Sequence, residues 1–377
     1  MDKQEKDFLN DSLLYQMSLG SKELYHSNVW AWLINKDPNF VLAFFDPSVF
    51  ETYKLSDYKI TASRETKSRD IIIWMDRKDQ KDHAYLIIEN KIKSLPYHEQ
   101  LEKYTEERFG KNKNKLIGAV VTGIEETLSK EERTIQKGEY AIEWTFRDYK
   151  KIAESILRIE RESAALSKNG QRQQIEEYCD VVLSIYKLLK NALSENRSLT
   201  DRGGKDLEET GLSSVFMKLN PARFVKRVLK EKPILEEGLS KGFLFEASNS
   251  IQQGEACFDC GYTNWKKDVP TYFRMGIQIQ GGQYRFFAAR GVDKSDSSER
   301  VCAEIYKDMI EQNWFCRDRV HGKKEYCSYK GADYAFVYQY EKMNDELKDD
   351  ETLIERIKTD LLRAKTTIDK YETRRDI

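Results

Sequence analysis

The sequence lacks any long apolar run. Its longest purely apolar stretches, such as Ile71 to Met75 and Val41 to Phe45, fall far below the roughly 18 residues that a membrane-spanning helix needs. The N-terminus, from Met1 to Asp7, lacks the basic start and the apolar core of a secretory signal. We therefore expect a cytoplasmic protein without a membrane helix.

The chain also has few cysteines and almost no net charge. The chain has 377 residues and 6 cysteines at irregular spacings, which do not resemble the disulfide framework of a small secreted protein. Lys and Arg number 63 and Asp and Glu number 64, so the formal net charge is -1. Proteins that coat nucleic acid without sequence preference usually carry a marked basic excess. That class is excluded, whereas a local basic groove is not.

Several motifs of known hydrolases and metal sites are missing. There is no Gly-rich phosphate loop, no G-x-S-x-G elbow and no H-E-x-x-H pair. Cys257 and Cys260 form a C-x-x-C pair, but Cys316, His321 and Cys327 are too loosely spaced to supply the other half of a zinc site. Ordinary reduced cysteines are the favoured interpretation, and zinc is the alternative.

The length suggests two domains, at roughly 150 residues per domain. A segment rich in Ser, Gly and charge predicts a linker at 196–212, between a first domain at 1–195 and a second at 213–377. The second domain reads as α+β. Its predicted strands are Phe243 to Ser248, Tyr272 to Gln280, Tyr284 to Ala289 and Tyr334 to Tyr340, with Gly281-Gly282 as a hairpin turn.

A long charged helix is predicted from Asp349 onward. Its apolar residues keep a heptad spacing: Ile354, Ile357, Leu361, Ala364, Ile368 and Tyr371. This stripe has two interpretations. It could pair two copies of the chain as a homodimer, or it could pack on its own domain, which is the favoured interpretation.

A β-hairpin is the most informative prediction in the first domain. Arg69 to Met75 and Ala84 to Ile92 are two runs rich in β-branched residues, and the polar segment Asp76 to His83 separates them. If Met75 lies opposite Ala84, antiparallel partners have residue numbers that sum to 159.

In that register Asp70 falls opposite Glu89, with Cβ atoms roughly 4.5 to 5.5 Å apart. Because side chains alternate along a strand, Lys91 lies on the same face. Two carboxylates this close repel each other unless a cation joins them, and hard oxygen ligands suit Mg²⁺ or Mn²⁺. Such an ion can activate a water and neutralise charge on a phosphate, and the ammonium can position or deprotonate the water. The pattern therefore predicts phosphodiester hydrolysis.

These residues resemble a known family. Asp70 followed by Glu89-Asn90-Lys91 resembles the D…E-x-K signature of the PD-(D/E)XK nuclease superfamily, which has the restriction-endonuclease-like fold. Gln100 and Tyr104 resemble the Q-x-x-x-Y motif of its RecB-like branch, and their spacing places them on one helix face. One departure is Arg69, which stands where the family pattern has Pro.

The resemblance implies a fold, a cofactor and a set of ligands. The fold would be α/β, a mixed β-sheet core flanked by helices, followed by the C-terminal α+β domain. Asp70, Glu89 and the main-chain carbonyl of Asn90 would bind Mg²⁺ or Mn²⁺. Glu23 or His26 would be an accessory ligand, because the early segment from Glu23 to Ser27 resembles the first motif of bacterial members. The alternative is a helix-capping Glu23 and a His26 packed beside Trp30.

The remaining roles also follow from the resemblance. Lys91 would be the catalytic lysine, and Gln100 and Tyr104 would shape the site or contact DNA. From Arg64 to Lys115 there are 13 basic and 10 acidic residues, an excess of 3 that supports a nucleic-acid path only modestly. The expected function is a metal-dependent nuclease acting on nucleic acid, with DNA favoured. Superfamily members serve in restriction, repair and defence against phage. The rival hypothesis is a catalytically inactive nucleic-acid or protein-binding module on the same fold.

Overall fold

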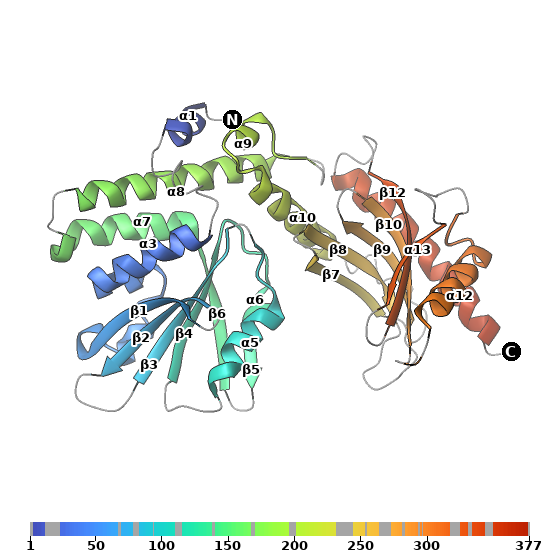
Figure 1. The fold of residues 1–377 in the computed structure, drawn as a ribbon, viewed down its shortest axis with the longest axis horizontal. Helices are drawn as coiled ribbons and strands as arrows, with labels where there is room; N and C mark the ends of the chain where they lie inside the picture. Colours follow the sequence, from blue (N-terminus) through green and yellow to red (C-terminus); the bar gives the residue numbers. More distant parts are fainter. Residues whose placement is uncertain are drawn as a thin grey trace. The chain divides into compact units, whose positions relative to one another are not determined.

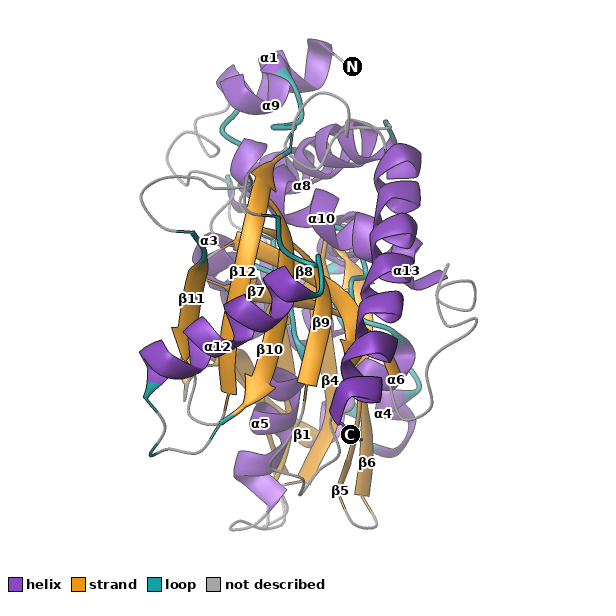
Figure 2. Cartoon of the chain, turned by 90° about the vertical axis from the view of Figure 1, so that its right-hand side faces the viewer, coloured by secondary structure: helices purple, strands orange, loops and turns teal. Residues whose placement is uncertain are grey.

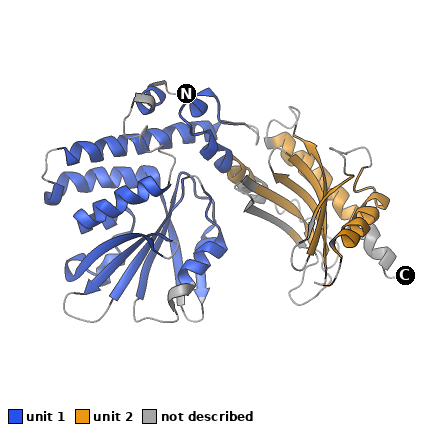
Figure 3. Ribbon diagram, in the orientation of Figure 1, with its two compact units in different colours: residues 1–195, 202–219 blue, residues 196–201, 220–377 orange. Residues whose placement is uncertain are grey.

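The computed structural model describes most of the chain, in two compact units. The described residues are 3–11, 23–66, 69–77, 83–92, 94–109, 115–137, 140–166, 170–195, 201–230, 244–252, 255–263, 273–280, 283–292, 295, 297–316, 325–330, 334–343 and 350–375. One unit comprises residues 1–195 and 202–219, and the other comprises residues 196–201 and 220–377 (Figure 3). Part of the predicted linker, residues 205–209, is helical.

The first unit is built on a mixed sheet. Its strands are β1 (Tyr58–Thr66), β2 (Arg69–Arg77), β3 (His83–Asn90), β4 (Lys115–Gly123), β5 (Thr134–Lys137) and β6 (Tyr140–Asp148). The six strands lie in the order β1-β2-β3-β4-β6-β5. The β1–β2, β2–β3 and β5–β6 pairs are antiparallel, whereas β3–β4 and β4–β6 are parallel. The expected mixed sheet is confirmed.

Helices flank this sheet. The longer ones are α1 (Lys3–Asp11), α3 (Glu23–Lys36), α5 (His98–Phe109), α7 (Tyr149–Glu162) and α8 (Gln171–Ser194). Short helical segments are η1 (Pro38–Ala43), α4 (Val49–Thr52), η2 (Leu55–Asp57), α6 (Lys130–Arg133), η3 (Ala164–Leu166) and α9 (Lys205–Glu209). Figure 1 shows α3, α7 and α8 on one side of the sheet and α5 and α6 on the other.

Strand alternation divides the core between the two faces of the sheet. The face under α5 is packed with one apolar cluster: Ile72, Tyr85, Ile87, Leu101, Tyr104, Ala119, Val121, Ile135 and Trp144. The intervening residues of β2 and β3, such as Ile71 and Ile88, are fully buried on the face toward α3 and α7. By the same alternation Glu89 belongs to the α5 face and Asn90 to the α3 face.

The second unit contains an antiparallel sheet. Its strands are β7 (Leu244–Gln252), β8 (Glu255–Thr263), β9 (Phe273–Gln280), β10 (Gln283–Gly291), β11 (Cys327–Lys330) and β12 (Tyr334–Lys342). The order is β11-β12-β10-β9-β8-β7, and every neighbouring pair is antiparallel. Gln280 pairs with Gln283, as the predicted hairpin requires, although the Gly281-Gly282 turn itself lies outside the described residues.

Helices α12 (Ser298–Glu311) and α13 (Asp350–Arg375) pack on one face of this sheet, as Figure 2 shows, and α10 (Ser213–Lys230) adds Phe224 to the same core. The α+β class of the C-terminal region is confirmed. The apolar stripe of α13, including Ile357, Leu361 and Ala364, is buried in this core. The stripe therefore packs on its own domain, and nothing in the described helix supports a homodimer.

The C-x-x-C pair lies within β8. Residues three apart in a strand point to opposite faces, and Cys260 belongs to the core beneath the helices whereas Cys257 does not. In the described part of the chain no three or more His, Cys, Asp or Glu side chains are placed to hold a metal ion. His321 lies outside the described residues. The two cysteine side chains of β8 therefore do not point to a common ligand position. Among the described helices, none has the length and the hydropathy of a membrane-spanning segment.

Candidate active site

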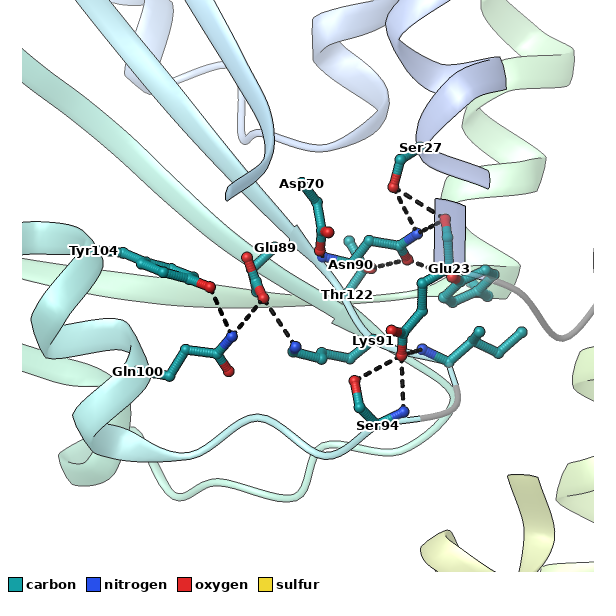
Figure 4. A network of polar contacts seen from close by, with 12 residues as sticks. Glu23, Ser27, Asp70, Glu89, Asn90, Lys91, Ser94, Gln100, Tyr104 and Thr122 are labelled. Carbon is teal, nitrogen blue, oxygen red and sulfur yellow. Dashed lines mark hydrogen bonds and ion pairs between the residues drawn. The ribbon is translucent and has the colours of Figure 1, made fainter. Parts of the chain in front are cut away.

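The β2–β3 hairpin has the register that the sequence predicts. Met75 pairs with Ala84, and the ladder continues to Ile71 opposite Ile88. One position further, Asp70 falls opposite Glu89 on the face under α5. The site lies where β3 ends, beside the ends of the parallel strands β4 and β6, which is where sheets with parallel strands usually bind their ligands. Figure 4 shows the polar side chains that gather there.

Asp70 is anchored to the neighbouring strand. Its Oδ2 accepts a hydrogen bond of 2.7 Å from the main-chain nitrogen of Asn90. Burial raises the pKa of the Asp70 carboxyl above its ordinary value, although this hydrogen bond and the nearby Lys91 ammonium act in the opposite direction. The hydrogen bond fixes one carboxylate oxygen against β3.

Glu89 is the most deeply buried carboxyl group of the site. It is 2 % exposed, and its Oε1 accepts hydrogen bonds from Gln100 Nε2 at 2.9 Å and from Lys91 Nζ at 2.9 Å. Its other oxygen, Oε2, is buried without a hydrogen-bond partner. Burial, reinforced by the nearby Asp70 carboxylate, raises the pKa of Glu89 from 4.5 to about 7. The Lys91 ammonium limits that rise.

Lys91 stays charged beside this carboxylate. Its side chain is 11 % exposed, and burial alone would lower the pKa of its ammonium group. Glu89, together with Asp70 and Glu23, outweighs burial, so the pKa of Lys91 is raised. A lysine in this state donates hydrogen bonds but does not accept a proton. Whether Lys91 positions or deprotonates a water stays a prediction.

Gln100 and Tyr104 both face the site from α5. The Nε2 group of Gln100 lies 2.9 Å from Glu89 Oε1 and 2.9 Å from the Tyr104 hydroxyl. Burial, with the Glu89 carboxylate nearby, raises the pKa of the Tyr104 hydroxyl. The expectation that this helix face turns toward the site is confirmed, and Gln100 holds the Glu89 carboxylate in position.

Arg69, which departs from the family pattern, anchors the same helix. Its side chain is 1 % exposed and donates a hydrogen bond of 2.8 Å from Nη2 to the main-chain oxygen of Tyr104. Its guanidinium carbon also lies 5.3 Å from the centre of the Tyr104 ring. Arg69 therefore ties β2 to α5. From the sequence, Arg69 is recognisable only as a substitution for Pro.

Glu23 reaches the site from α3, where it holds the chain that follows β3. Its Oε1 accepts hydrogen bonds from the Ile92 nitrogen at 3.2 Å, from the Ser94 nitrogen at 2.7 Å and from Ser94 Oγ at 2.7 Å. The expected role as an accessory metal ligand stays a prediction. What the structure adds is that Glu23 fixes the segment immediately after Lys91.

His26 lies in the core beneath the sheet. It is 0 % exposed, its Nδ1 is 3.0 Å from the Tyr178 hydroxyl, and its ring packs on Tyr149 with centres 5.0 Å apart. Trp30 is also adjacent, at 6.1 Å between ring centres. These contacts match the alternative in which His26 packs beside Trp30.

The side chain of Asn90 connects the site to that core. Its Nδ2 donates to the main-chain oxygen of Glu23 at 2.7 Å and to Ser27 Oγ at 3.0 Å. Its Oδ1 accepts from Thr122 Oγ1 at 3.1 Å and from the Tyr149 hydroxyl. The family resemblance implies a role only for the main-chain carbonyl of Asn90. Strand alternation within Glu89-Asn90-Lys91 is the sequence signal for the side chain, because the middle residue must point to the opposite face of the sheet.

The donor set of the site fits a divalent cation in part. Asp70 and Glu89 offer carboxylate oxygens of the kind that Mg²⁺ and Mn²⁺ prefer, and Glu89 Oε2 is a buried acceptor without a partner. A third acidic or histidine ligand does not complete the set within the residues that the structure describes. The Glu89 and Asp70 carboxylates are therefore the groups that could hold such an ion.

One comparison with known proteins gives a family match within the first unit. A family model described as PD-(D/E)XK nuclease superfamily matches residues 11–180, the region that contains every residue of the site. No curated protein and no solved structure matches the chain significantly. The match does not distinguish branches of the superfamily, so the RecB-like assignment from Gln100 and Tyr104 stays a prediction.

Proposed function

Because residues 11–180 belong to the PD-(D/E)XK nuclease superfamily, we propose that this protein is a metal-dependent nuclease that hydrolyses phosphodiester bonds, with DNA as the favoured substrate. One observation carries the proposal. Asp70 and Glu89 are adjacent on one sheet face, Lys91 pairs with Glu89 at 2.9 Å, and Glu89 Oε2 is left without a partner. A self-contained structural ion pair would not need a second carboxylate and an unused acceptor at the same place.

Each residue has a role in this proposal. Asp70, Glu89 and the main-chain carbonyl of Asn90 would hold Mg²⁺ or Mn²⁺, which supplies positive charge at a phosphate and acidifies water. Lys91, charged in the structure, would donate hydrogen bonds to the attacking water or to a phosphate oxygen. Gln100 orients Glu89 through its hydrogen bond to Oε1, which reduces the rearrangement needed when substrate binds.

The test is a cleavage assay with matched variants. Purified full-length protein is incubated with Mg²⁺ or Mn²⁺ and with end-labelled duplex DNA, single-stranded DNA and RNA. The expected products carry a 5′-phosphate and a 3′-hydroxyl, as the family resemblance implies. Lys91→Met should lower kcat by about 10²-fold to 10⁴-fold. Lys59→Met is the control, because Lys59 is exposed and lies opposite Asp76 at the far end of the hairpin. The proposal would be contradicted if no substrate is cleaved with either metal, or if Lys91→Met keeps full activity.

A second candidate is a binding module without catalysis. It is favoured by the incomplete set of acidic and histidine ligands among the described residues and by the use of Glu23 to hold the main chain. This candidate requires nucleic-acid binding that neither EDTA nor Asp70→Asn changes, with no cleavage. An electrophoretic shift assay with and without chelator, run beside the cleavage assay, separates the two functions.

A further inference from the structure

The C-terminal sheet has a second face that differs from its helix-covered core. Strand alternation places Arg274, Gln278, Arg285, Phe287, Phe336 and Tyr338 on this face. A small apolar cluster on it consists of Phe287, Ala289 and Phe336, with Tyr334 and Tyr338 packed against it. All five residues come from β10 and β12. We call this surface the aromatic face of the C-terminal sheet.

An aromatic row runs along β12. Tyr334, Phe336, Tyr338 and Tyr340 occupy every second position of the strand and therefore share the aromatic face. Ring centres are 5.9 Å apart between Phe336 and Tyr338 and 6.4 Å apart between Tyr338 and Tyr340. Phe336 is buried, whereas the three tyrosines are partly exposed. An ordinary core-facing row would be buried throughout.

Arg285 supplies a positive charge beside this row. Its guanidinium donates hydrogen bonds to Oε1 of Gln278, Gln280 and Gln283 at 2.8, 2.6 and 2.8 Å. Its central carbon lies 4.6 Å from the centre of the Tyr338 ring. The neutral amides fix the plane of the guanidinium but do not neutralise it.

The charge of Arg285 is not matched on the aromatic face. No carboxylate of the described residues forms an ion pair with Arg285, whereas Arg274 on the same face pairs with Asp259. A partly buried cation without a counterion costs free energy unless an anion arrives. The fixed guanidinium plane stacked on a tyrosine is therefore an arrangement that favours a ligand with both negative charge and flat ring surfaces.

We propose that the aromatic face binds single-stranded nucleic acid, with bases stacked along the tyrosines of β12 and a phosphate at Arg285. Single strands present both unstacked bases and phosphates, and proteins bind them by aromatic platforms combined with cationic grooves. A duplex keeps its bases stacked inside, so it offers this face phosphates alone. The surface stands on its own contacts, but the choice of nucleic acid as the partner rests on the proposed nuclease function.

The experiment measures binding without cleavage. The full-length protein is titrated in EDTA against fluorescein-labelled oligothymidylate and oligouridylate of about 20 nucleotides, and against a duplex of the same length, by fluorescence anisotropy. Arg285→Gln and Tyr338→Leu should each weaken single-strand binding about tenfold. Tyr338→Phe, which keeps the ring, should stay within about twofold of the unmodified protein. Arg290→Gln is the matched control, because Arg290 pairs with Glu304 of α12, away from the aromatic face.

The salt dependence gives a second readout. Loss of one phosphate contact at Arg285 should reduce the slope of log affinity against log salt by about 0.7, whereas Tyr338→Leu should leave that slope unchanged. Thermal unfolding of each variant checks that the fold is intact, and Tyr338→Leu against Tyr338→Phe carries the test if Arg285→Gln unfolds. Absence of single-strand binding, equal affinity for the duplex, or binding that survives both substitutions overturns the inference. Because EDTA removes metal-dependent cleavage, a failed nuclease assay leaves this measurement intact.

Discussion

The ammonium nitrogen of Lys91 lies 2.9 Å from Oε1 of Glu89, while Oε2 of the same carboxylate has no hydrogen-bond partner. A buried carboxylate oxygen without a partner is unfavourable, and either a proton or a cation relieves it. The raised pKa of Glu89 means that this carboxylate takes up a proton more readily than an exposed glutamate. The site therefore has two ways to reach a stable state, protonation of Glu89 and binding of a cation.

Glu89 should make the stability of the metal-free protein depend on pH. Its pKa is raised from 4.5 to about 7, so the folded state binds the proton more tightly than the unfolded state. The resulting stabilisation is complete below pH 4.5, is lost as the pH rises to about 7, and stays lost above it. Glu89→Gln removes this dependence. In urea unfolding with EDTA, the variant should gain about 1–3 kcal/mol relative to the unmodified protein between pH 4.5 and pH 8. A constant difference across that range would contradict the burial argument.

Divalent metal should compete with the proton at the same carboxylate. Because the pKa of Glu89 is about 7, binding of Mg²⁺ or Mn²⁺ at pH 7 should release about half a proton per ion from this group. Apparent affinity should rise by up to about tenfold per pH unit below 7 and level off above pH 8. Calorimetry in two buffers with different ionisation enthalpies measures the released protons. Asp70→Asn should weaken binding, and an affinity that stays constant from pH 6 to pH 8 would exclude Glu89 as a ligand.

Arg69 should act on catalysis through α5. Arg69→Met removes the hydrogen bond to the Tyr104 carbonyl and the contact of the guanidinium with the Tyr104 ring, at a cost of about 2 kcal/mol in unfolding free energy. Loss of the tie between β2 and α5 should also move Gln100 away from Glu89 and lower kcat about tenfold. Arg64→Met is the control on the neighbouring strand, since Arg64 is exposed and its loss should change stability by less than about 0.5 kcal/mol. Equal effects of the two substitutions would show that Arg69 does not anchor the helix.

Asn90 should matter for stability more than for chemistry. Asn90→Ala leaves the Glu23 carbonyl, Ser27 and Tyr149 without their shared partner, which should cost about 2–4 kcal/mol. The main-chain nitrogen of residue 90 still donates to Asp70, so kcat measured on the folded fraction should change only a few-fold. Denaturant unfolding and active-site titration at low temperature separate the two effects. A large loss of kcat with unchanged stability would assign the Asn90 side chain to the reaction itself.

The register of the hairpin could be predicted because the two strands are almost continuously apolar. The runs Arg69 to Met75 and Ala84 to Ile92 are buried on both faces over most of their length, so few other pairings keep their apolar residues inside. The spacing of Gln100 and Tyr104 places them on one helix face, and the resemblance to the Q-x-x-x-Y motif implies that this face turns toward the site. The hairpin register and the shared helix face depend on residues that are close in sequence, so local patterns are enough to predict them.

The roles of Arg69 and Asn90 could not be predicted because their partners are distant. Arg69 bonds Tyr104, 35 positions away, and Asn90 bonds Tyr149, 59 positions away. Strand β8 is not among the strands predicted from the sequence. Phe258, Cys260 and Tyr262 alternate with smaller or polar residues in the pattern of a strand, but the C-x-x-C pair in the same segment is also typical of a metal-binding loop.

The alternation within Glu89-Asn90-Lys91 makes these three residues a link through the thickness of the sheet. On the α5 face of the sheet lie the charged groups and the expected position of the substrate. On the α3 face, Asn90 contacts Tyr149, Tyr149 packs on His26, and His26 contacts Tyr178. A genetic screen for inactive alleles should therefore recover substitutions on both sides, including aromatic positions that no substrate can touch. The residues essential for activity would then include those that hold Asn90 in place through Tyr149, His26 and Tyr178, in addition to the catalytic groups.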